Sequence, residues 1–173
     1  MNIFFTLASY VVNAYTHPLL LFIRNIHKVV DVFKKSCYIQ TMMYETIDKP
    51  KNVSYEQLDR AIDYACRYLG LEDTFIELTF ETLGHMAGHC DVEDGIAEIS
   101  INQRLRGKTL ELTIFHELVH VKQILDGKLV VGEGLSPSTW CGIIYTCPYD
   151  QLPWEVEAYK LEKLMMENYN GSS

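Results

Sequence analysis

Two histidines and a glutamate share the short run His116-Glu117-Leu118-Val119-His120, whose residue types and spacing suit a metal-binding helix. On a helix, residues four apart lie on one face, so both imidazoles can reach a single ion. Glu117 lies one step around the helix, beside the open coordination position, where its carboxylate can take a proton from an attacking water. The pattern predicts Zn²⁺ bound by His116 and His120, with Glu117 as the general base.

Residues 109–125 are predicted to form the helix that carries this motif, with a stop at Gly127. The helix is apolar enough to be buried, and buried polar groups without partners cost roughly 1–3 kcal/mol each. A bound metal ion would satisfy the histidines and the glutamate. The simpler alternative is a helix whose histidine face meets water or a carboxylate.

A third protein ligand is expected, because catalytic zinc has three and keeps its fourth position for water. The last predicted helix, from Pro153 to about Tyr169, offers Glu155 and Glu157. These two glutamates are two residues apart and cannot both point the same way on a helix. Ala158 is small and lies on the Glu155 face, which would let that face approach the histidine helix closely. We therefore predict Glu155 as the ligand and keep Glu157 in reserve.

The two motifs together resemble the gluzincin branch of zinc metallopeptidases. HELVH on one helix and PWEVEAY on a later one look most like compact phage-type metallopeptidases, which pair HExxHxxQ with a downstream PWExEA. The likeness covers about residues 75–164. It includes Gln123, Trp140, Gly142 and Tyr145. The gap of 34 residues between His120 and Glu155 is longer than in the tightest gluzincins.

This resemblance implies a small zincin-like (minimal gluzincin) fold and hydrolysis of a peptide or protein substrate. In related families the first glutamate of an ExxA pattern is the ligand, which again favours Glu155. Two other interpretations stay open: a metal-stabilised binding or structural module without turnover, and a zinc hydrolase of a non-peptide substrate. Glu117 favours an enzyme, because a structural zinc site needs no base and more often closes its fourth position with Cys or His.

Aromatic residues between and within the two motifs are further candidates. The tetrahedral oxyanion of peptide hydrolysis needs a donor besides the metal, and the intervening loop contains Tyr145 and Tyr149. The simpler interpretation is that both tyrosines pack their rings against the body. Trp140 and Trp154 either line the pocket or, more simply, pack in the core.

The remaining elements predict an α+β fold in the order helix, strands, helix, long loop, helix. Ser54 as N-cap and Gly70 as stop bound a helix over 55–69. Runs of β-formers at 75–80 and 96–101 predict two strands of a small antiparallel or mixed sheet. The second strand is a candidate for pairing an extended substrate through its edge, the simpler interpretation is that it only belongs to the sheet, and the two are compatible.

A second group of ligand-type side chains lies between these strands and contains His85, His89 and Cys90. Gly84 and Gly88 stand among them. This composition favours a strand-connecting loop over a second metal site.

The net charge of −8 divides unevenly along the chain. Residues 1–41 carry four basic residues and one acidic residue, for +3, whereas residues 42–173 carry 11 basic and 22 acidic residues, for −11. We therefore predict a basic N-terminal segment joined to a metallopeptidase domain over 42–173. The acidic balance argues against nucleic-acid binding. The five cysteines are scattered and form no CxxC pair, which suits a reducing compartment such as the cytoplasm. For a phage-type protein this would be the cytoplasm of the host.

Residues 2–23 contain no charged side chain, a run long enough to cross a bilayer. Polar residues and Pro18 interrupt it, and it lacks the cleavage site of a secretory signal. Three interpretations stay open: membrane association, an apolar helix that packs on the body or a partner, or a native start at Met42 or Met43. No feature of the sequence indicates an oligomeric state.

Overall fold

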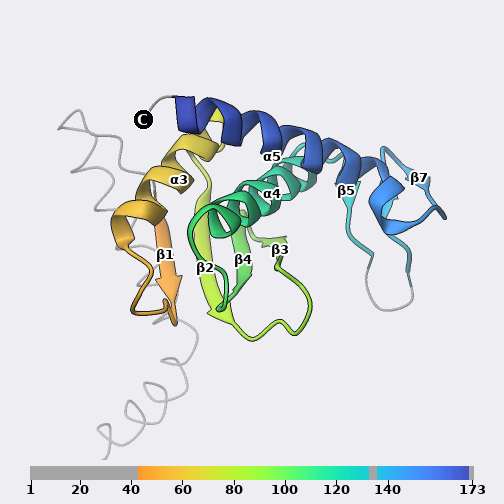
Figure 1. Ribbon diagram of the computed structural model, residues 1–173. Helices are drawn as coiled ribbons and strands as arrows, with labels where there is room; N and C mark the ends of the chain where they lie inside the picture. The colour runs from red at the N-terminus through yellow and green to blue at the C-terminus, as the bar shows by residue number, and fades with distance from the viewer. Residues whose placement is uncertain (1–42, 133–135, 172–173) are drawn as a thin grey trace, which may run out of the picture. The chain divides into compact units, whose positions relative to one another are not determined.

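The computed structural model describes residues 43–132 and 136–171, which form an α+β arrangement (Figure 1). The helices are α3 (Tyr55–Leu69), α4 (Gly107–Leu125) and α5 (Pro153–Gly171), with the 3-10 helix η1 (Tyr149–Gln151) before α5. The larger sheet contains β1 (Tyr44–Ile47), β2 (Phe75–Glu81), β3 (Gly88–Glu93) and β4 (Ile96–Asn102). A smaller sheet contains β5 (Leu129–Val130), β6 (Thr139–Trp140) and β7 (Ile143–Ile144). The predicted α+β class is confirmed.

The larger sheet is mixed and has the strand order β1-β2-β4-β3. β1, β2 and β4 run parallel, whereas β3 pairs antiparallel with β4. The β3–β4 turn is made by Asp94 and Gly95, with φ of 51° and 78°. Positive φ at both central residues is the requirement of a tight hairpin turn, and Asp-Gly meets it readily.

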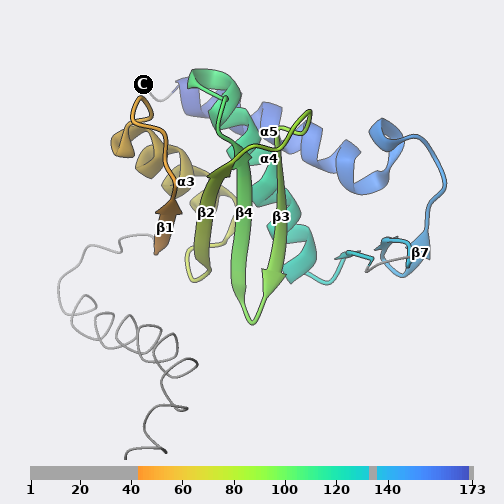
Figure 2. The same ribbon diagram turned by 90° about the horizontal axis from the view of Figure 1, so that it is seen from below.

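One face of this sheet packs against the helices. Alternate residues of β2 and β4 are buried, as expected where one face meets a core. These are Ile76, Leu78, Phe80, Ala97, Ile99 and Ile101. Figure 2 shows α3, α4 and α5 all on this side of the sheet, with α5 against α4.

The motif-bearing helix α4 lies between the sheet and α5, and ten of its 19 residues are buried. Val119 and Val121 are almost completely buried, although residues two apart point to nearly opposite sides of the helix. Contacts with β3, β4, α3 and α5 explain this burial on several faces. Any polar side chain on α4 near its middle is therefore removed from water.

The predicted helices are confirmed, with α4 beginning two residues earlier than expected. Ser54 caps α3, because its Oγ accepts a hydrogen bond from the Gln57 N–H at 3.0 Å. At the other end the Gly70 N–H donates to the Cys66 carbonyl. The predicted strands at 75–80 and 96–101 are also confirmed.

Two predictions about the sheet were wrong. Residues 88–93, expected in a loop, form β3; this segment is polar and short, and pairing with β4 stabilises it more than its composition does. The strand at 96–101 is β4, which has β2 on one side and β3 on the other. Both of its edges are already paired, so it cannot bind an extended substrate through an edge.

None of the helices within residues 43–132 and 136–171 has the length and apolar character needed to cross a membrane. The predictions for residues 1–41, including membrane association through 2–23, lie outside the described residues.

Candidate metal centre

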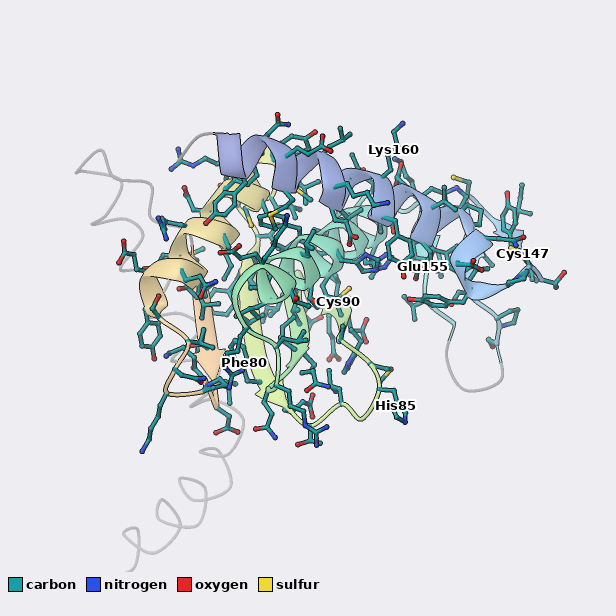
Figure 3. All side chains as sticks on the ribbon, viewed as in Figure 1. Phe80, His85, Cys90, Cys147, Glu155 and Lys160 are labelled. Carbon is teal, nitrogen blue, oxygen red and sulfur yellow. The ribbon has the colours of Figure 1, made fainter. Side chains whose placement is uncertain are left out.

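Three ligand-type side chains from two helices converge on one point. His116 and His120 lie one turn apart on α4. Glu155 projects from the first turn of α5, as Figure 3 shows. The two imidazole Nε2 atoms are 3.0 Å apart. Glu155 Oε2 is 3.2 Å from His116 Nε2, and Glu155 Oε1 is 3.4 Å from His120 Nε2. The structure thus brings together the three side chains that the sequence predicts as ligands.

These separations fit a metal ion. Ligand atoms at the ordinary zinc distances of about 2.0–2.1 Å, arranged as a tetrahedron, lie about 3.3 Å from one another. Glu155 Oε2 is also buried without a well-aligned hydrogen bond from the described residues, although His116 Nε2 is 3.2 Å away. Two ring nitrogens and a carboxylate oxygen this close need a proton or a cation between them.

A further side chain contacts the Nδ1 atom of each imidazole, on the side of the ring away from the other ligands. His116 Nδ1 lies 2.8 Å from Glu162 Oε2, and His120 Nδ1 lies 2.8 Å from Gln123 Oε1. Both partner oxygens are acceptors, so they favour a proton on Nδ1 and leave the Nε2 lone pairs facing each other and Glu155. This is the tautomer that metal ligation through Nε2 requires.

Glu162 was not predicted as a site residue, although its position in the sequence gives a signal. Glu162 lies seven residues after Glu155, two helical turns along the same face of α5, and so it also faces α4. Gln123 was noted only as part of the resemblance. Its place three residues after His120 puts it on the neighbouring turn of α4.

Charge reinforces the pairing of His116 and Glu155. Burial by itself lowers the pKa of His116, but hydrogen bonds to Glu155 and Glu162 outweigh it and raise this pKa to about 9. Burial by itself raises the pKa of Glu155, but its close contacts with His116, His120 and Tyr149 lower this pKa to about 2. Without a metal, the favoured state at neutral pH is a protonated His116 beside an ionised Glu155.

The reserve candidate Glu157 lies elsewhere. Its Oε2 accepts a hydrogen bond from Gln123 Nε2 at 2.9 Å, and its Oε1 lies 3.4 Å from Lys128 Nζ. Gln123 Nε2 also donates to the Trp154 carbonyl at 3.0 Å. Glu157 therefore supports Gln123, which in turn holds His120.

Glu117 is buried, with 5% of its surface exposed, and points toward the larger sheet rather than into solvent. Burial raises the pKa of its carboxyl group, while the nearby His116 and His120 lower it and Glu155 raises it further. A carboxylate in such a place is poised to exchange a proton.

Aromatic side chains border the three ligands. Tyr149, on η1, is within hydrogen-bonding reach of Glu155, and burial raises the pKa of its hydroxyl. Tyr145 packs its ring edge-on against Trp154, with centroids 6.5 Å apart. Tyr149 is thus placed beside the site, whereas the contact described for Tyr145 is with a buried tryptophan. Trp140 is half-buried, with Lys128 Nζ 5.9 Å from its ring centroid.

A tyrosine that the sequence analysis did not single out also contacts the site. The Tyr159 ring centroid lies 4.9 Å from that of His116. Tyr159 follows Glu155 by four residues, and the same periodicity that relates Glu162 to Glu155 would have found it.

The second group of ligand-type residues is not brought together. His89 and Cys90 are neighbours on β3 and therefore point to opposite faces of the sheet. His85 lies in the preceding loop, away from both Cys90 and Glu155 (Figure 3). Within the described residues, only His116, His120 and Glu155 form a three-ligand group.

Comparisons with protein-family models, with curated proteins and with solved structures find no match for this chain. The resemblance to gluzincins therefore rests on its two motifs. The functional proposal rests on the geometry of the three-ligand group and of the glutamate beside it.

Proposed function

We propose that this protein is a zinc-dependent peptidase in which His116, His120 and Glu155 hold the metal and Glu117 is the general base. The observation that carries this proposal is the spacing of 3.0–3.4 Å among the three ligand groups, with a buried glutamate next to them. Two imidazoles and one carboxylate are a common ligand set of catalytic zinc. Three protein ligands leave a position for water.

The fold supports the same proposal. A short mixed sheet carries α4 with the HExxH motif on one face, and α5 brings the third ligand against α4. We propose that this arrangement is a zincin-like, minimal gluzincin fold. The long segment between the two helices contains the small β5–β7 sheet and η1.

Several side chains of this protein have separate roles in the proposed hydrolysis. A bound zinc ion would supply a Lewis acid that acidifies water and polarises the peptide carbonyl. Glu117 takes a proton from the attacking water and returns it to the leaving amine. Glu162 and Gln123 keep the two imidazoles in the tautomer that presents Nε2. Tyr149, beside Glu155, is the better placed of the two predicted oxyanion donors.

The end strand β3 offers a place for an extended substrate. β3 is last in the strand order, so its outer edge has no strand partner within the described part of the chain. A peptide in extended conformation can add to such an edge through main-chain hydrogen bonds. Because α4 packs on β3, a peptide bound there would run beside Glu117.

The test compares the wild type with Glu117→Gln, using metal analysis of freshly purified protein and cleavage of a library of internally quenched peptides. Glu117→Gln should keep stoichiometric zinc and lose about 10²–10⁴-fold in turnover. Glu111→Gln is the matched control, since Glu111 lies earlier on α4 and bonds to Gln57. It should change neither property.

Zinc-free wild type or unchanged turnover of Glu117→Gln would contradict the proposal. Stoichiometric zinc without cleavage of any peptide would instead favour the metal-stabilised module or a hydrolase of a non-peptide substrate.

A further inference from the structure

The Glu117 carboxylate lies against β3, and two inward positions of this strand contact it. β3 alternates between partly buried and exposed residues, and its partly buried residues Gly88 and Cys90 pair with Ile101 and Ile99 of β4. Because those two isoleucines are buried under the helices, Gly88 and Cys90 also face α4. Figure 3 shows Cys90 on the part of β3 beneath α4.

Gly88 leaves the space that the carboxylate fills. A Cβ atom at this position would lie 2.8 Å from Glu117 Oε1 and 3.0 Å from both the Ser100 carbonyl oxygen and Thr113 Cγ2. The backbone φ of Gly88 is not positive, so its conformation does not itself call for glycine. The Glu117 carboxylate, the Ser100 carbonyl and Thr113 together leave no room for a side chain at this position, and Glu117 makes the closest approach.

Cys90 supplies a donor on the same face, two residues along. Its side chain is within hydrogen-bonding reach of the Glu117 carboxylate. Burial, followed by the negative charge of Glu117, raises the pKa of the Cys90 thiol, so it stays protonated. A protonated thiol donates a weak hydrogen bond, and a carboxylate is a strong acceptor.

The start of β3 is anchored independently of Glu117. The Asn102 side-chain amide donates to the Met86 carbonyl at 2.9 Å, and the Asn102 N–H donates to the Ala87 carbonyl at 2.8 Å. These bonds fix the backbone that leads into Gly88. The strand is therefore a rigid surface against which a side chain can be positioned.

We propose that Gly88 and Cys90 form a seat on β3 that positions the Glu117 carboxylate for proton transfer. This inference rests on the proposed role of Glu117 as general base. Gly88 provides clearance and Cys90 provides a hydrogen bond, so the carboxylate keeps one orientation on the buried side of α4. Both are positioning residues, since they act through Glu117.

The S–H stretching band in the infrared spectrum tests the contact without turnover. The difference between the wild type and Cys90→Ala isolates the band of Cys90. Glu117→Gln offers this thiol a weaker acceptor, and Gly88→Ala displaces the carboxylate, so both should shift the band to higher wavenumber. His89→Ala, at the exposed position between them, should leave it unmoved. The Cys66 band, isolated by Cys66→Ala, should respond to none of these changes.

Turnover of a cleaved peptide tests the positioning role. Gly88→Ala should lower kcat about 10²-fold, since a displacement of about 1 Å costs this much, while KM and zinc affinity stay unchanged. Cys90→Ala should lower kcat about threefold to tenfold, the effect of one modest hydrogen bond. Cys90→Ser keeps a hydrogen-bond donor and should therefore recover most of the kcat that Cys90→Ala loses. The two Cys90 variants also test the proposal if Gly88→Ala does not fold.

The outcomes separate the seat from the proposed function. If the wavenumber of the Cys90 band is the same in Glu117→Gln as in the wild type, the seat is overturned, whether or not the protein cleaves peptides. A shifted band together with unchanged kcat in both Gly88→Ala and Cys90→Ala overturns its positioning role. A shifted band in a protein that cleaves no peptide supports the contact and counts only against peptide hydrolysis.

Discussion

The two histidines of α4 are held by chemically different partners. Glu162 places a carboxylate behind His116, whereas Gln123 places a neutral amide behind His120. A carboxylate partner makes an imidazole more basic and a stronger ligand, while an amide mainly fixes its tautomer and orientation. His116 therefore holds the proton in the metal-free protein, and a metal would displace this proton on binding.

Glu155 and Glu157 offer a matched pair for testing the ligand assignment. Glu155→Gln should weaken zinc binding by more than about 100-fold, because it removes a ligand rather than an outer partner. Glu157→Gln should weaken it by about tenfold or less, because Glu157 acts only through Gln123. Competition with a chromophoric chelator measures both affinities. Equal losses in the two variants would contradict the assignment.

The raised pKa of His116 makes the stability of the metal-free protein depend on pH. This pKa rises from 6.5 to about 9 on folding. The stabilisation that protonated His116 gives the folded state is therefore fully present below pH 6.5 and is lost as the pH rises through 9. We expect the free energy of unfolding in a chelator to fall by roughly 2–3 kcal/mol across this range. Urea unfolding at several pH values measures it.

The control for the pH experiment is His116→Gln, which has no proton to lose and should flatten this part of the profile. At acid pH the relevant group is Glu155, whose pKa is lowered from 4.5 to about 2. The stabilisation that ionised Glu155 gives the folded state is therefore present above pH 4.5 and is lost as the pH falls through 2. A metal-free stability that rises between pH 6.5 and 9 would contradict the His116–Glu155 pairing.

At the scale of elements, the site depends on how closely α5 approaches α4. Ala158 is completely buried, one turn beyond Glu155 on the face toward α4, as the small residue in the sequence predicted. Gln123 adds a polar link by donating to the Trp154 carbonyl and to Glu157. A small side chain and a satisfied amide together hold the two helices close.

Ala158→Leu should therefore separate the helices. We expect a loss of roughly 1–3 kcal/mol from overpacking and weaker zinc binding, since the ligands would no longer converge. Val156→Leu on the exposed face of α5 is the control, because half of that side chain already meets solvent. Thermal unfolding and chelator competition measure the two effects. Unchanged zinc affinity in Ala158→Leu would show that Ala158 does not set the approach.

Element prediction succeeded where a pattern was long and local. The periodicity and caps of α3, and the apolar character of α4, depend on neighbours along the chain and are visible in the sequence. β3 escaped prediction because its stability comes from pairing with β4. β1 and the three short strands β5–β7 also depend on partners distant in sequence.

At the scale of the molecule, the ligands join two helices that are far apart in sequence. His116 and His120 belong to α4, which lies against the sheet, and Glu155 belongs to α5, which packs on α4 from the other side. A metal bound by all three would connect the inner and outer helices. Binding should therefore stabilise the whole described body and not only its site.

Zinc at 100 times its Kd should raise the free energy of unfolding by about 2.7 kcal/mol, provided that the unfolded chain does not bind it. Hydrogen exchange should show the added protection in α5 as well as in α4. Glu155→Gln should lose the effect, and removal of the metal with a chelator should reverse it. Protection confined to α4 would show that Glu155 is not a ligand.

The sequence by itself determined which side chains make up the candidate metal centre. The spacing in His116-Glu117-Leu118-Val119-His120 places two imidazoles on one helical face. Ala158, a small residue three positions after Glu155, favours Glu155 over Glu157. Both facts follow from the geometry of a single helix, which local sequence dictates. The α+β class followed similarly from the periodicity of separate segments.

Only the tertiary structure decided what surrounds these groups. It paired Glu162 with His116 and Gln123 with His120, and it placed Gly88 and Cys90 of an unpredicted strand against Glu117. Apart from the contact of Gln123 with His120 within α4, these contacts join residues from different elements, so no local pattern encodes them. They arise because α4 is packed between the sheet and α5, where most buried polar groups are paired with one another instead of with water.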